Sequence, residues 1–393
     1  MSEVKPILKK NRLLPTASQE LLLKACLLPG DEAVLAWEQW RNREDLDFLD
    51  HSSNRLLPLL FHNLEKHGVA DEVMLRYKGT FRKNWYKNQL LFAELKEVVQ
   101  LLQNEGIETM VLKGSALLLS KTYPSYGLRP MADLDVLVPA SQIAKAIEVL
   151  DENNWNSILR QSYIDNEPAF LKRKKIGADY FSICASGGFR NPEMREFDLH
   201  SHAFVLSANS PQLDADFWTR SKAYPLTNRL SVQILSPTDT LLHSVSHGLR
   251  RGTQINLRWV ADAFYLIHSH SIDWELLLSN AKRLGLTPFV KYGLLYLEEL
   301  LNAEIPSDIL EQLKALQTSK KEMVHFESEN YPVRKTANLR LLWNQHTRIN
   351  SKKSVLAQLG LFPKHLQGVY FLEHVWQVPS LIMYKLLRVK KKG

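Results

Sequence analysis

The stretch LKGSALLLSKTYPSYGLRPMADLDVLVP, residues 112–139, decides the fold. Near its end Asp133 and Asp135 alternate with apolar residues, which is typical of a buried strand. Residues two apart in a strand point to the same side, so we expect both carboxylates to face one direction. Two like charges on an apolar strand are costly unless a cation lies between them, and Mg²⁺ prefers oxygen ligands. The pair therefore predicts a divalent metal site for Mg²⁺ or Mn²⁺.

The start of the same stretch suits a phosphate group. Gly114-Ser115 is predicted to open a short helix, where backbone N–H groups, a hydroxyl and the positive helix end can face an anion. Lys113 could contact a triphosphate as a point charge, and Arg129 as a bidentate fork. For both cations the alternative is an ion pair with a nearby acid. For the two aspartates the alternative is a turn cap and a solvated strand end, which the Gly-Ser turn upstream disfavours.

A third carboxylate is expected on a neighbouring strand, where residues 197–200 read Phe-Asp-Leu-His. Asp198 has apolar neighbours on both sides, which favours it over Glu196 as the third acid. His200 shares the strand face of Asp198 and could orient the acid or contact the substrate. His202 lies on the same face and is expected to be structural.

Apolar periodicity divides the chain into three regions. Residues 1–90 are predicted to be an N-terminal helical region, 91–235 a core of strands and helices, and 236–393 a C-terminal helical region. The β-α-β-α-β order of elements indicates an α/β core. With helical regions on both sides of this core, the expected fold class of the chain is α+β, a mixed sheet with helices. Strands are predicted over 109–112, around Asp133 and over 178–184 and 195–203, with a turn at 186–188 and helices over 140–153, 238–249, 257–268, 274–284 and 288–301.

The chain carries 50 Lys or Arg and 42 Asp or Glu, a formal net charge of +8 that is moderate for 393 residues. Solubility explains this charge as well as a phosphate-bearing substrate does. Basic clusters at 9–12, 172–175 and 388–392 lack an aromatic-rich stripe, which weakens the case for nucleic-acid recognition. Two distant cysteines predict no disulfide framework. We expect a cytoplasmic protein, because no signal peptide or membrane span is evident.

Together these motifs resemble the polymerase β-type nucleotidyltransferase superfamily, and in particular its poorly characterised bacterial branch, the NTP_transf_5-like proteins. The resemblance covers about residues 90–270. The chain departs from better-known members in having a lysine before Gly114 and a single glycine before the serine. The likeness is carried by Leu112-Lys113-Gly114, by LRPMADLDVLV at 128–138, by Asp198-Leu199-His200, by Leu235-Ser236-Pro237, by His243 and His247, and by LRWVAD at 257–262.

The resemblance implies a metal-dependent enzyme that transfers a nucleoside monophosphate from an NTP, expected to be ATP, to a hydroxyl acceptor and releases pyrophosphate. It implies catalytic and metal-binding roles for Asp133, Asp135 and Asp198. The acceptor is expected to be a small molecule, a peptide or a protein. The alternatives are an RNA or tRNA nucleotidyltransferase and a non-catalytic nucleotide-binding scaffold. The residues expected to bind the nucleotide are Lys113, Gly114, Ser115 and Arg129.

Further polar residues lie downstream on predicted helices. His243 and His247 have a spacing able to bind zinc, but no glutamate lies between them, which excludes a metalloprotease. Helix packing, or contact with the nucleotide or the acceptor, is the expected role of these histidines. Asp262 is expected to form an ion pair with Arg258, four residues before it.

Overall fold

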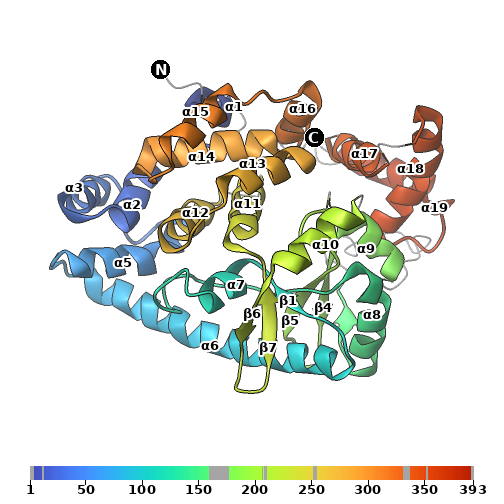
Figure 1. The fold of residues 1–393 in the computed structure, drawn as a ribbon, viewed down its shortest axis with the longest axis horizontal. Helices are drawn as coiled ribbons and strands as arrows, with labels where there is room; N and C mark the ends of the chain where they lie inside the picture. The colour runs from blue at the N-terminus through green and yellow to red at the C-terminus, as the bar shows by residue number, and fades with distance from the viewer. Residues whose placement is uncertain are drawn as a thin grey trace. The chain divides into compact units, whose positions relative to one another are not determined.

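The computed structural model describes residues 4–10, 13–158, 177–205, 207, 210–250, 255–330, 337–350 and 353–390. The chain forms two compact units, each assembled from segments far apart in the sequence (Figure 1). The three consecutive regions expected from the sequence follow the change of secondary structure along the chain and, as domains, stay a prediction. The first unit comprises Met1–Ala93, Leu112–Ala132 and Ile234–Asn330, and the second comprises Glu94–Val111, Asp133–Gln233 and Tyr331–Gly393.

A seven-stranded sheet is the framework of the second unit, with strand order β3-β4-β5-β2-β1-β7-β6. β2 and β5 run parallel, whereas β1 pairs antiparallel with β2 and β4 pairs antiparallel with β5. This mixed sheet with accompanying helices confirms the predicted α+β class. The strands are β1 (Met110–Val111), β2 (Asp135–Leu137), β3 (Asn156–Ser157), β4 (Ser186–Arg190), β5 (Glu196–His200), β6 (Lys222–Pro225) and β7 (Ser231–Ile234).

The apolar residues that alternate with the acids form the core of this sheet. Val136 and Leu199 are register partners on β2 and β5, and both are fully buried. Phe197 lies over Phe189 with ring centroids 5.9 Å apart and meets the ring of Trp155 edge-on at 5.1 Å. Each such buried side chain contributes about 1.5–3 kcal/mol relative to an exposed one. This packing fixes the register in which the acids meet.

Helices make up the rest of the second unit. The helix predicted over 140–153 begins as a 3₁₀ turn and continues as an amphipathic α-helix that buries Ile143, Ala146, Val149 and Leu150. The helices are η1 (Ala140–Gln142), α8 (Ile143–Glu152), α9 (Ala178–Cys184), α10 (Pro211–Arg220), α17 (Ala337–Ile349), α18 (Val355–Val369) and α19 (Gln377–Lys390).

The first unit is helical, as the sequence predicts for its segments. Local capping explains several helix ends: Thr16 and Gln19 form a capping box, and Ser236 accepts a bond from the backbone N–H of Asp239. Its helices are α1 (Val4–Lys10), α2 (Ala17–Leu27), α3 (Gly30–Arg41), α4 (His51–Asn54), α5 (Leu57–Lys66), α6 (Met74–Asn104, which continues into the second unit), α7 (Lys113–Leu119), α11 (Pro237–Gly248), α12 (Arg258–Ser269), α13 (Trp274–Arg283), α14 (Thr287–Leu301), α15 (Ser307–Ala315) and α16 (Lys320–Asn330).

One part of the predicted core was wrong. Residues 178–184, predicted as a strand, form helix α9, and the predicted turn at 186–188 is the start of β4. α9 ends where Ala185 adopts a left-handed conformation with φ of 58°. Gly188 then lies opposite Asp198, and a Cβ on this glycine would be 3.4 Å from Oδ1 of the aspartate. A Cβ at this distance would be in van der Waals contact with the carboxylate, so the glycine gives Asp198 slightly more space without being required there.

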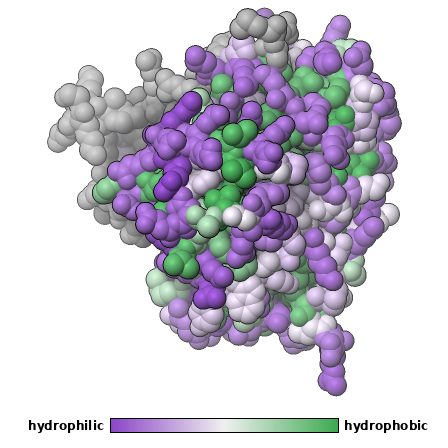
Figure 2. Space-filling model, turned by 90° about the vertical axis from the view of Figure 1, so that its left-hand side faces the viewer, coloured by the Kyte–Doolittle hydropathy of each residue, from purple (hydrophilic) through white to green (hydrophobic). Residues whose placement is uncertain are grey.

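The face of the first unit that carries α2, α3 and α5 is mainly hydrophilic, with groups of apolar side chains among the polar ones (Figure 2). Leu35 on α3 is one exposed apolar residue of this unit. Among the described helices, none combines the length and the apolar character needed to cross a membrane.

Candidate functional site

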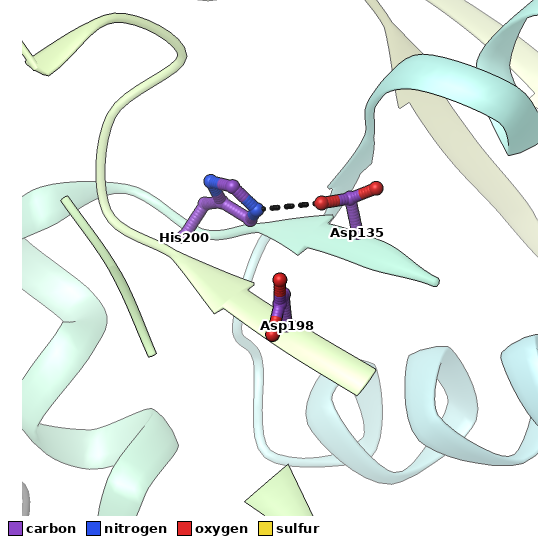
Figure 3. Close-up of side chains that lie close together, drawn as sticks. All are labelled: Asp135, Asp198 and His200. Carbon is purple, nitrogen blue, oxygen red and sulfur yellow. Dashed lines mark hydrogen bonds and ion pairs between the residues drawn. The ribbon is translucent and has the colours of Figure 1, made fainter. Parts of the chain in front are cut away.

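Three titratable side chains of the sheet point toward one another (Figure 3). Asp135 on β2 and Asp198 on β5 are register partners on adjacent parallel strands, and His200 follows on the same face of β5. One ligand atom from each residue lies within 4.8 Å of the others. The Nε2 atom of His200 is 2.9 Å from Oδ1 of Asp135. Within the described ranges, this is the one cluster of three such groups that could hold a metal ion.

Burial makes this cluster electrostatically demanding. Asp135 is 2% exposed, His200 is buried as well, and Asp198 is half-buried. Two neighbouring carboxylates repel each other when both are charged, and burial adds a desolvation cost to each charge. The hydrogen bond from His200 offsets part of that cost for Asp135. A cation held by both carboxylates offsets more of it.

The donor set fits a divalent ion. Two carboxylates supply the hard oxygen ligands that Mg²⁺ and Mn²⁺ prefer, and an imidazole nitrogen is compatible with Mn²⁺ and other transition metals. If His200 does not ligate the ion itself, its bond to Asp135 orients that ligand from behind. Either way the histidine belongs to the same centre as the two acids.

The other acids considered from the sequence lie elsewhere. β2 begins at Asp135, so Asp133 precedes the strand; it is exposed and is not a member of the three-residue cluster. Glu196 is exposed and accepts a hydrogen bond from Nε of Arg190 at 2.6 Å. The acid that the sheet brings beside Asp135 is therefore Asp198, the one favoured from its apolar neighbours.

His202 has a separate contact. It is buried, and its Nδ1 atom lies 3.2 Å from Oδ1 of Asp214 on α10. The same oxygen accepts a hydrogen bond from the hydroxyl of Ser207 at 2.9 Å. These contacts tie the segment after β5 to α10, which agrees with a structural role.

In the first unit, the residues expected to contact the nucleotide open α7. Lys113 has a φ of 52°, a left-handed conformation that costs a non-glycine residue about 1–3 kcal/mol. Gly114 is required by its surroundings, since a Cβ there would lie 2.3 Å from Nη1 of Arg129 and 2.9 Å from Met131. Ser115 is buried, with its hydroxyl 3.9 Å from the sulfur of Met131. The serine hydroxyl thus points into the packing of this turn.

Arg129 forms a buried ion pair with Asp262 on α12. Its Nε and Nη2 donate to the two carboxylate oxygens at 2.7 and 2.8 Å, and the hydroxyl of Tyr123 donates to Oδ1 at 2.6 Å. Burial first, and the nearby Asp262 charge second, raise the pKa of Tyr123 well above its usual value, so the hydroxyl stays a donor. The spacing argument expected Asp262 to pair with Arg258. Both its oxygens instead bond Arg129, while Arg258 donates to the carbonyl of Pro130 at 3.0 Å.

The loop that carries Arg129 is anchored by a residue that the sequence analysis missed. Asn88 on α6 is fully buried and donates to the carbonyls of Tyr126 and Arg129 at 2.6 and 2.9 Å. Its own side-chain oxygen accepts from the backbone N–H of Met131 at 3.3 Å. A polar residue on the apolar face of a long helix was the signal that could have identified it.

His243 and His247 remain outside any metal group of the described chain. Their rings stack with centroids 5.7 Å apart, and His243 is buried whereas His247 is exposed. The basic cluster at 172–175 lies outside the described residues.

Comparison with known proteins shows the family of this chain. The model of a family described as uncharacterised nucleotidyltransferase matches residues 51–302. The match spans more than half of the sequence, and the chain belongs to this family; it is a nucleotidyltransferase and hence a transferase. Among solved structures, an antigenic nucleotidyltransferase-like protein from Paracoccidioides brasiliensis is 15% identical, with a TM-score of 0.36 over 58% of this chain and 94% of that chain. No curated protein matches.

Proposed function

We propose that the protein transfers a nucleoside monophosphate from an NTP to a hydroxyl group and releases pyrophosphate, with a divalent metal held by Asp135 and Asp198. The observation that carries the proposal is the register pairing of these two acids on adjacent parallel strands, with His200 beside them. Nucleotidyl transfer needs positive charge at the triphosphate and a positioned acceptor more than it needs covalent chemistry from the protein. A divalent cation held by the two carboxylates would meet the first need.

The roles within the centre follow from burial and position. Asp135 and Asp198 hold Mg²⁺ or Mn²⁺, which neutralises charge on the triphosphate when bound. His200 holds Asp135 in its ligating orientation through the 2.9 Å bond. Asp133, exposed and two residues before Asp135, is proposed as an additional acid that reaches the metal once a nucleotide is present.

The proposed contacts with the nucleotide are based on the sequence motifs. Lys113 is proposed to contact the triphosphate, with backbone N–H groups of Gly114 and Ser115 beside it. Arg129 was expected to be a direct contact; its bidentate bond to Asp262 favours the alternative, an ion pair with an acid, and its guanidinium lies close to Gly114. The unusual backbone conformation of Lys113 supports a functional role for this turn, because strained residues persist where the surroundings enforce them.

The NTP is proposed to be ATP and the acceptor a small molecule, a peptide or a protein, with His243 or His247 as further contacts. We further propose that the protein is cytoplasmic and that its family is a bacterial branch of the polymerase β-type superfamily. These finer assignments come from the sequence motifs alone.

The test is a pyrophosphate-release assay with the purified full-length protein. Each common NTP is supplied with Mg²⁺ or Mn²⁺, together with a small-molecule or a protein fraction of a host lysate. We expect release that needs metal, prefers ATP and depends on one of the two fractions. Release that persists in a chelator, or that is absent with every NTP and fraction although the metal binds, would contradict nucleotidyl transfer.

A further inference from the structure

Positive charge is concentrated in the last part of the sequence. Residues 331–393 contain twelve Lys or Arg and a single acid, Glu373, whereas acids slightly outnumber basic residues in the rest of the chain. Such an imbalance between segments is typical of contact with an anionic surface. The segment includes α17, α18 and α19, which Figure 1 shows as neighbours at the red end of the chain.

These three helices build their own apolar core. Phe362, Val369 and other partly buried residues pack around a group of fully buried side chains, so the segment does not need further apolar residues for its packing. The buried members are Leu342, Leu366, Tyr370, Leu372, Val378 and Leu381.

A second set of apolar residues lies on the outside. Val355, Leu356 and Leu359 in the first turns of α18 are 68%, 82% and 54% exposed. Their spacing of one, three and four places them on one side of the helix. Trp376, in the turn before α19, is also exposed and stacks on His374 with centroids 5.8 Å apart. Large apolar side chains gathered at a surface typically mark a contact site.

An exposed lysine lies next to this apolar side, since Lys353 directly precedes the N-cap residue Ser354. Lys364 is also exposed, but it lies five residues beyond Leu359 and therefore about 140° around the helix. Aliphatic side chains beside a lysine, on a segment of strong positive charge, match the boundary of a lipid bilayer, where acyl chains accept the former and headgroup phosphates the latter. RNA offers the same phosphates but no apolar phase for valine and leucine.

We propose that the start of α18, namely Val355, Leu356 and Leu359 with Lys353 beside them, binds the surface of an anionic lipid bilayer. The other basic residues of 331–393 add long-range attraction to the same surface. The contact is peripheral, because it involves only the exposed side chains at the first two turns of α18. It is independent of the chemistry at Asp135 and Asp198.

The test is co-sedimentation of the full-length protein with vesicles. Phosphatidylcholine vesicles are compared with vesicles containing roughly one third phosphatidylglycerol, at low and at physiological salt. We expect binding to the anionic vesicles only. Replacing Leu356→Ser together with Leu359→Ser should weaken partitioning at least about tenfold. Replacing Lys353→Gln should weaken partitioning about fivefold, chiefly at low salt. Lys364→Gln, on the other side of the helix, should weaken it less.

Leu35→Ser is the matched control, because Leu35 is 55% exposed on α3 of the other unit. All replaced residues are exposed, so circular dichroism should show unchanged folding. Equal binding by the double serine variant and the Leu35→Ser control would overturn the proposal. A second result would also overturn it. In that case an RNA homopolymer displaces the wild-type protein from the vesicles, and the double serine variant binds the same RNA as tightly as the wild type does. Sedimentation velocity showing a dimer that the serine variant dissociates would assign the surface to a second copy instead.

Discussion

Asp135 combines deep burial, a like-charged neighbour and a hydrogen bond from His200, so it is the residue where charge and geometry can be separated most cleanly. Replacement by asparagine keeps an oxygen that accepts from His200 and removes only the charge. We expect Asp135→Asn to fold normally and to lose pyrophosphate release by more than about 100-fold, since even partners of metal ligands are worth 10–100-fold. Asp198→Asn should behave in the same way.

Glu196→Gln is the control for this prediction. Glu196 lies on the same face of β5 but is exposed and bonded to Arg190. The enzyme with this replacement should keep wild-type activity. Comparable losses in the Glu196 and Asp135 variants would show that charge anywhere on this face matters, and the assignment of the metal ligands would fail.

His200 allows a second prediction at the same centre. His200→Ala removes the bond to Asp135, and we expect the affinity for Mn²⁺ to fall about 10–100-fold. His200→Gln, whose amide can still donate to Asp135, should recover part of the loss. Calorimetric titration of the purified protein with Mn²⁺ measures both. If both variants bind Mn²⁺ as the wild type does, His200 has only a structural role.

The Arg129–Asp262 pair gives a stability prediction. Asp262→Ala leaves a buried guanidinium and the Tyr123 hydroxyl without this partner, so we expect a loss of about 3–5 kcal/mol in the free energy of unfolding. The triple variant Arg129→Met, Asp262→Leu, Tyr123→Phe removes all the polar groups together and should recover much of that loss. Urea titrations of both variants give the comparison. A loss below about 1 kcal/mol for Asp262→Ala would mean that water replaces the carboxylate.

The sequence identified some of these residues and not others for a physical reason. Alternation and apolar neighbours are local properties, so Asp135 and Asp198 could be chosen and Asp198 preferred to Glu196. The partner of Asp262 could not be identified in this way, because Arg129 lies 133 residues away in the sequence. Arg258, at helical spacing, was the nearer cation. The first residue of the strand could not be predicted from the sequence either. β2 begins at Asp135, so Asp133 lies outside it.

At the scale of elements, the four helices between residues 237 and 301 were predicted within a few residues because their apolar periodicity is clear. The segment that forms α9 was predicted as a strand and the start of β4 as a turn, because glycine is normally a turn signal. Gly188 instead stands in a strand, where it pairs with Asp198 on the next strand. Cross-strand packing of this kind leaves no trace in the local sequence.

The C-terminal helices supply a prediction on pH. His365 is buried on α18, where desolvation first and the neighbouring His346 second lower its pKa to about 4. The unfolded chain, with a pKa near 6.5, takes up the proton first as the pH falls, so acid favours unfolding. Between pH 6.5 and 4 this residue should cost up to about 3 kcal/mol of stability, and above pH 6.5 nothing.

His365→Leu is the test of this pH dependence. An apolar side chain of similar size cannot titrate, so the free energy of unfolding of this variant should vary less between pH 6.5 and 4 than that of the wild type. Unfolding of α17–α19 can be followed by hydrogen exchange, which resolves this segment from the rest of the chain. An unchanged pH profile would show that His365 is hydrated in solution.

At the scale of the whole molecule, a net charge of +8 conceals a basic C-terminal segment and a nearly neutral remainder. This distribution bears on whether RNA is the acceptor, because phosphate contacts release counterions and make affinity fall steeply with salt. Exposed aromatic and basic side chains also lie next to one another on one described helix. On α6, Trp85 and Tyr86 are exposed beside Lys83 and Lys87, a pairing that the sequence analysis did not single out.

We predict that RNA is nevertheless not the acceptor. Binding through scattered lysines should be non-specific, with dissociation constants of about 10⁻⁴–10⁻⁶ M at physiological salt. Filter binding of total host RNA at low and physiological salt measures this for the wild type and for Trp85→Ala with Tyr86→Ala. Nanomolar binding that survives physiological salt and is lost in the double variant would make α6 a stacking platform and RNA the acceptor. Neutralising the basic cluster at 172–175 is a further test, because loss of tight binding in that variant would also make RNA the acceptor.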